Sequence, residues 1–179
     1  MPGPTHPSAG RVLLAATVVA VADMLDAIIV WVVIFQKATV PRIFQSVASG
    51  LLGPDSFKGG AATAALGLVL HACVALGWTL VFFLLLRSWP SLRRWTASTR
   101  GAVVTGLVYG AAVWLFMDGV VLPLSRAHAT PITAAWFWIQ LATHPFVVGL
   151  PIALILGRAG RSSAVVEAAA VPQAAPGIR

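Results

Sequence analysis

The chain has 179 residues, of which 59% are hydrophobic and only 9% are charged, and its mean hydropathy is +0.90. A soluble domain carries about 25% charged residues, so this composition excludes an ordinary soluble protein and indicates an integral membrane protein. The net charge of +7 does not indicate a nucleic-acid partner, because the basic residues are scattered over helix ends and loops and form no basic patch.

Four apolar segments are each long enough to cross a bilayer, at about residues 12–35, 61–86, 101–122 and 132–157. Their apolarity is continuous, which favours helices over barrel strands, whose apolar residues alternate. The sequence predicts an all-α fold, an integral membrane four-helix bundle that forms one domain over residues 11–158. Residues 1–10 and 159–179 are predicted to be a disordered N-terminus and a disordered cytoplasmic tail.

The first span contains Asp23 and Asp26, which are three residues apart and therefore share a helix face. The sequence AVA before Asp23 has the form of a signal-peptidase site, so a cleaved leader is an alternative. Apolar residues resume at 28–35 and complete a full span, which favours a retained transmembrane helix.

Residues 41–60, between the first two spans, have apolar side chains near helical spacing with polar side chains between them. They predict a short amphipathic helix that ends at Gly53-Pro54 and lies at the outer interface or re-enters the bundle as a cap. Gln45 and Ser49 of this segment are candidates for the outer mouth of the bundle. Asp118, near the outer end of the third span, is a third candidate and is expected to touch water or the 41–60 segment.

Small residues form packing faces on the second and third spans. The second span repeats small or polar residues at four-residue steps: Gly59, Thr63, Gly67, His71 and Ala75. The third has the pair Gly106 and Gly110. Such faces let helices approach closely, within the bundle or against a second copy or another membrane protein.

The fourth span places Trp136, Gln140 and His144 at four-residue steps, which makes a polar stripe on an otherwise apolar helix. Pro145 and Pro151 follow, and each removes a backbone donor and can kink the helix.

Three stretches carry a resemblance to a family: QSVASGLLGPDSFKGG (45–60), TAALGLVLHACVALGW (63–78) and HPFVVGLPIAL (144–154). They resemble motif blocks of small four-span bacterial inner-membrane proteins of unknown function. The resemblance implies a compact four-helix inner-membrane protein with His71 and His144 as characteristic positions, and it implies no activity.

Basic residues near the span ends divide eight to four between the two sides of the membrane. One side carries Arg11, Arg87, Arg93, Arg94, Arg100, Arg158, Arg161 and Arg179, and the other carries Lys37, Arg42, Lys58 and Arg126. Because positive charge concentrates in cytoplasmic loops, both termini are predicted to be cytoplasmic, in a multi-pass protein of the inner membrane.

Polar residues of three spans fall at one depth when residues are counted along the helices at about 1.5 Å per residue. The layer contains Asp23, Asp26, His71, Gln140 and His144. An ionisable group at this depth costs at least about 2.5 kcal/mol, so such groups face the bundle interior and mark sites or pathways.

Three interpretations of this polar cluster stay open. It is a hydrogen-bonded network that fixes helix order in a structural or accessory component. It is a proton relay or the site of a carrier of protons or a small solute, because a carboxylate beside a histidine accepts protons in low dielectric. Alternatively, His71 and His144 are axial ligands of one b-type haem, with Gly67 and Ala75 giving room for the macrocycle.

No other cofactor is predicted. A structural zinc site needs four ligands, which the cluster does not provide. The sequence contains no Walker loop, dinucleotide fingerprint, HExxH or GxSxG, so the chain is not expected to be an enzyme.

Overall fold

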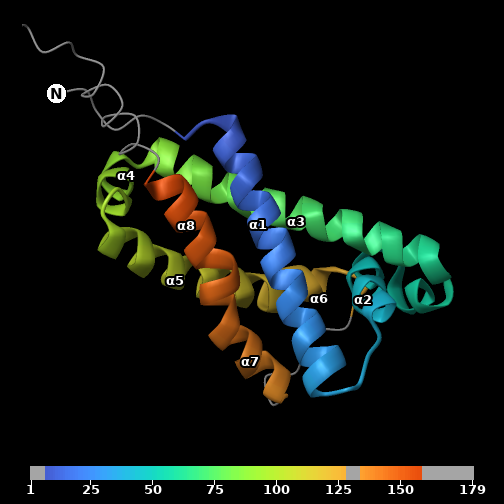
Figure 1. The fold of residues 1–179 in the computed structure, drawn as a ribbon. Helices are drawn as coiled ribbons and strands as arrows, with labels where there is room; N and C mark the ends of the chain where they lie inside the picture. Colours follow the sequence, from blue (N-terminus) through green and yellow to red (C-terminus); the bar gives the residue numbers. More distant parts are fainter. Residues whose placement is uncertain (1–6, 128–133, 159–179) are drawn as a thin grey trace, which may run out of the picture.

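The computed structural model describes residues 7–127 and 134–158, which contain helices and no strand. Four helices in this part of the chain are long and apolar enough to cross a membrane, namely Ala9–Ile34, Gly60–Ser88, Thr99–Leu124 and Ala135–Gly157 (Figure 1). The predicted all-α four-helix bundle is confirmed. The predicted N-terminal disorder is wrong at Ala9 and Gly10, which are helical, while the predicted tail at 159–179 and residues 132–133 lie outside the described residues.

Three of the four spans change from α-helix to π-helix along their length, and Gly60–Ser88 alone is one continuous α-helix, α3. The first span consists of α1 (Ala9–Ile28) and η1 (Ile29–Ile34). The third consists of α5 (Thr99–Phe116), η3 (Met117–Val121) and α6 (Leu122–Leu124). The fourth consists of α7 (Ala135–His144), η4 (Pro145–Gly149) and α8 (Leu150–Gly157), and η4 begins at Pro145 because proline has no N–H to donate.

A short helix, α2 (Val40–Leu52), lies between the first two spans and packs against α3. The contact is close, because a Cβ on Gly67 of α3 would meet the carbonyl oxygen of Phe44 in α2. The helix ends before Gly53, as predicted, where φ is 67° and glycine is favoured. A 3-10 turn, η2 (Gly53–Lys58), then leads into α3.

The buried face of α2 differs from its apolar stripe. Gln45 and Ser49 are buried with Ile43 and Ala48, while Leu51 is 56% exposed. The helix is therefore a cap packed on α3 through polar as well as apolar side chains.

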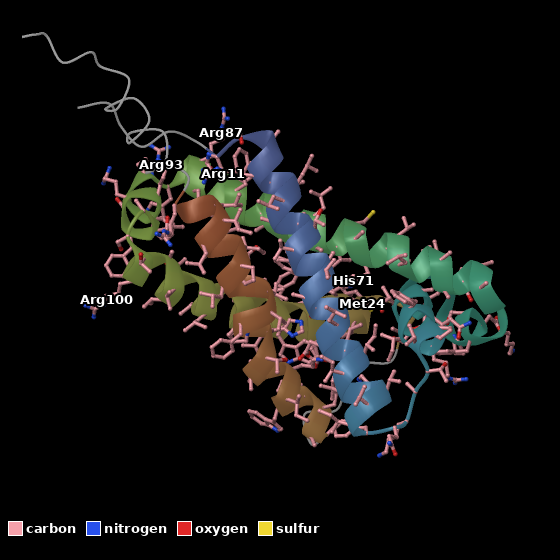
Figure 2. All side chains as sticks on the ribbon, in the orientation of Figure 1. Arg11, Met24, His71, Arg87, Arg93 and Arg100 are labelled. Atoms are coloured by element: carbon pink, nitrogen blue, oxygen red, sulfur yellow. The ribbon has the colours of Figure 1, made fainter. Side chains whose placement is uncertain are left out.

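The two ends of the bundle differ in charge. Figure 2 places Arg11, Arg87, Arg93 and Arg100 at one end, called here the arginine end, where α4 (Pro90–Thr96) joins the second and third spans. The opposite end, called the cap end, carries α2. There the backbone N–H of Arg126, just after α6, donates to the carbonyl of Gly50.

The apolar core fills the half of the bundle toward the arginine end. Its most deeply buried large side chains are Phe82 and Leu86 from α3 and Ile152 and Leu156 from α8. Exposed large apolar side chains are numerous on the surface of all four spans, as expected where lipid and not water surrounds a helix.

The third and fourth spans cross at glycine residues, as predicted from the pair Gly106 and Gly110. A Cβ on Gly149 of η4 would meet the carbonyl oxygen of Gly106 and the backbone of Gly110 in α5. Backbone therefore touches backbone where the two spans cross, and this contact fixes the position of His144, five residues earlier on the fourth span.

Candidate functional site

Asp23 of α1 lies between the two membrane histidines. Its Oδ1 atom is 3.5 Å from Nε2 of His144 in α7, and its Oδ2 atom is 3.9 Å from Nε2 of His71 in α3. The side chains are 23%, 10% and 12% exposed for Asp23, His144 and His71, respectively. The carboxylate of Asp23, on the first span, thus contacts side chains of the second and fourth spans, near the middle of each span.

The ring of His71 has a defined tautomer. Its Nε2 atom is 2.9 Å from the carbonyl oxygen of Ala20 on α1. A carbonyl only accepts, so Nε2 carries a hydrogen and donates it. The same N–H faces Asp23, at a longer distance. His71 is therefore held by the backbone of α1 while its N–H is available to the carboxylate.

His144 is held by the side chain of Gln140, one turn earlier on α7. Its Nδ1 atom is 3.0 Å from Oε1 of Gln140, an acceptor, so Nδ1 donates and Nε2 of a neutral ring is an acceptor. That acceptor faces the carboxylate Oδ1 of Asp23, which is also an acceptor. Two acceptors repel each other unless a proton lies between them.

Asp26 belongs to the same cluster through Thr143. The hydroxyl of Thr143 lies 3.2 Å from Oδ2 of Asp26 and 3.0 Å from Oε1 of Gln140. Gln140 is 2% exposed. All five residues predicted to share a layer are therefore brought together, and Thr143 connects them.

The prediction of the site missed Thr143 and Trp114. Thr143 could have been found, because it precedes His144 and lies one helical turn after Gln140. Trp114 of α5 packs against the ring of His144, with the ring centroids 4.8 Å apart. No spacing rule points to Trp114, because the contact depends on how α5 and α7 cross.

The outer-mouth candidates do not form one site. Nε2 of Gln45 donates to the carbonyl of Gly60 in α3, and the hydroxyl of Ser49 donates to the carbonyl of Ser46 within α2, so each satisfies a backbone carbonyl. Asp118, which was expected to touch water or the 41–60 segment, lies in η3 and is 7% exposed, and no described residue hydrogen-bonds to its Oδ1.

The room predicted for a haem beside Gly67 and Ala75 is taken by protein atoms. The backbone of Phe44 fills the space beside Gly67, and Ala75 is packed in the apolar core. Nε2 of His71 donates its hydrogen to the carbonyl of Ala20 and Nε2 of His144 faces Asp23, so neither nitrogen is free for an axial bond. The arrangement therefore does not fit a bis-histidine haem, and this alternative gains no support.

The described residues include no group of three or more His, Cys, Asp or Glu side chains that could hold a metal ion. Comparison with protein-family models, with curated proteins and with solved structures found no match to this chain. What the protein does is therefore inferred from the chemistry of the cluster.

Proposed function

We propose that this small polytopic membrane protein binds protons at the cluster around Asp23 and carries them across the membrane. The observation that carries this proposal is the contact of one partly buried carboxylate with Nε2 of two histidines from two other helices. Histidine changes charge near neutral pH, and a carboxylate next to it exchanges protons with it. Membrane pumps and transporters use such Asp and His chains as relays.

A relay through Asp23 needs only a small motion. His71 would take up a proton at Nδ1 and give its Nε2 hydrogen to Oδ2 of Asp23, and the proton between Oδ1 and His144 would then move to Nε2 of His144. For this step the N–H of His71 would turn from the carbonyl of Ala20 toward Asp23. The π-helical segments η1 and η4 begin close to the cluster, and such segments often occur at functional sites.

A polar solute is a less suitable cargo than a proton. A cavity of ≈ 200 Å³ lies beside the cluster between α1 and α3, and His71 is its one polar lining residue. The other lining side chains are apolar, among them Met24 and Leu68. A polar solute in this cavity would lose its water and gain a single partner.

The orientation we infer puts the arginine end in the cytoplasm of a bacterial cell, in the inner membrane. The basic residues gathered at this end support it, because positive charge is retained on the cytoplasmic side. The cap end would then face outward, with α2 over it.

A structural or accessory role is the second candidate, and the apolar half of the bundle favours it. Between the cluster and the arginine end the core contains Phe82, Leu86, Ile152 and Leu156. A proton could cross this half only if the helices moved apart, whereas a structural network needs no motion.

Proton flux into vesicles separates the two candidates. The purified protein would be reconstituted with a pH-sensitive dye inside the vesicles, and a pH gradient would be imposed. A carrier dissipates the gradient, and Asp23→Asn abolishes this flux because an amide does not exchange protons. Asp55→Asn is the matched control, since Asp55 is exposed in η2 and pairs with Lys58, away from the cluster. Wild-type flux no faster than that of protein-free vesicles would reject the carrier and leave the structural role.

A further inference from the structure

Two polar atoms on one face of the third span are buried without a partner. Nε1 of Trp114 and Oδ1 of Asp118 have no hydrogen-bond partner among the described residues, and each side chain is 7% exposed. The residues are four apart, on α5 and η3, so they lie on the same side of the helix. Buried polar groups are nearly always hydrogen-bonded, so these two atoms indicate a bound partner.

The chemistry of the two atoms identifies that partner as water. The indole N–H only donates, and an aspartate oxygen accepts. One water molecule can accept from the first and donate to the second, and buried waters bridge groups in this way. A metal cation would be repelled by the N–H, and an anion would be repelled by the carboxylate.

The position of the pair connects it with the cluster. The ring of Trp114 packs against the ring of His144, and Asp118 lies one turn farther toward the cap end. On the other side of the cluster the core is apolar. Trp114 and Asp118 therefore extend the polar region from His144 toward the cap end.

We propose that Trp114 and Asp118 hold water that connects the Asp23–His144 pair with the cap-end surface, and that Asp118 exchanges protons with that surface. The inference rests on the proposed function for its role in proton movement. The presence of water at Trp114 and Asp118 does not depend on the proposed function. The hydration and the role in proton movement are therefore tested separately.

Exchange of the indole N–H with deuterium tests the hydration. The protein with ¹⁵N-labelled tryptophan would be placed in D₂O, and Trp114→Phe would identify the Trp114 signal by its loss. We expect the Trp114 N–H to exchange as fast as that of Trp89, which is 60% exposed near the arginine end. Asp118→Leu removes the acceptor and should slow the exchange of Trp114 alone. Slow exchange in the wild type would mean a dry pair and would overturn the proposal whatever the flux.

Flux in vesicles tests the role in proton movement. Trp114→Phe keeps an aromatic ring but removes the indole N–H, and Asp118→Asn keeps the shape but does not exchange protons. Both should lose flux, while Trp138→Phe, a change at a 56% exposed tryptophan of α7, should keep it. Full flux in both test variants would overturn the pathway. If the wild type carries no protons, the proposed function fails, and the exchange result alone decides the hydration.

Discussion

Asp23 makes the two membrane histidines depend on each other, although they lie on different helices and do not hydrogen-bond directly. Removing His144 leaves Oδ1 of Asp23 without its closest imidazole nitrogen, and removing His71 does the same for Oδ2. A buried group that loses one partner becomes more dependent on the other.

The substitutions His71→Ala and His144→Ala should therefore not be additive in their effect on stability. In a double-mutant cycle on thermal unfolding in detergent, we expect a coupling of about 0.5 kcal/mol or more, as is usual for residues that share a network. Residues without a shared partner add within about 0.3–0.5 kcal/mol. Strict additivity would show that Asp23 does not link the two histidines.

Thr143 should stabilise the fold through its hydroxyl alone. Thr143→Val keeps the shape of the side chain and removes the donor that faces Asp26 and Gln140. Side-chain hydrogen bonds between membrane helices average about 0.6 kcal/mol, so we expect a loss of that order in the free energy of unfolding. Thr17→Val, at an exposed position of α1, is the matched control and should change stability less. Equal effects of the two substitutions would contradict the bridging role.

At the residue level, the sequence identifies the charged members of the cluster and misses the groups that connect them. Asp23, His71 and His144 stand out because an ionisable side chain is costly at bilayer depth, and counting along helices places them in one layer. Trp114 does not stand out, since a tryptophan in an apolar segment costs little. Nor could the burial of Asp118 be read from its position near a helix end.

At the element level, the crossing of α5 and η4 determines where His144 lies. The crossing depends on glycine on both helices, because Gly149 contacts the backbone of Gly106 and Gly110. Backbone atoms cannot move aside as a side-chain end can, so a methyl group at this place must separate the helices.

Gly149→Ala should accordingly destabilise the protein by about 1–3 kcal/mol, the usual cost of overpacking a tight contact. Gly77→Ala on α3 is a suitable control, because a Cβ there meets no atom within 4 Å. Alanine also favours helix over glycine by about 0.5–1 kcal/mol, so Gly77→Ala should be neutral or stabilising. Thermal unfolding of the two variants in detergent measures the difference, and a neutral Gly149→Ala would contradict the close crossing.

The four spans could be predicted because length and continuous apolarity suffice to identify a transmembrane helix. The π-helical segments could not be predicted, except at Pro145. A π-helix bonds residues five apart and an α-helix bonds residues four apart, and this difference has no simple sequence pattern. The packing of α2 could not be predicted from its apolar residues either, because its buried side includes Gln45, whose amide donates a hydrogen bond to the carbonyl of Gly60.

At the scale of the whole molecule, the proposed orientation in the membrane rests on the charge of the two ends. With the arginine end in the cytoplasm, Lys58 and Arg100 lie on opposite sides of the membrane. Lys58→Cys and Arg100→Cys, each combined with Cys73→Ala, would be treated with a membrane-impermeant thiol reagent in intact spheroplasts. We expect labelling at position 58 and none at 100 until the membrane is opened. The reverse pattern would invert the orientation, and labelling at both positions would contradict the span count.

We propose that Asp23, His71 and His144 bind protons as one coupled unit. Nuclear magnetic resonance of the ¹⁵N-labelled histidine rings over a pH series measures this directly, with His71→Gln and His144→Gln to assign the signals. We expect both rings to respond to the same protonation steps and Asp23→Asn to change the titration of both. Two independent titrations, each unchanged by Asp23→Asn, would contradict it.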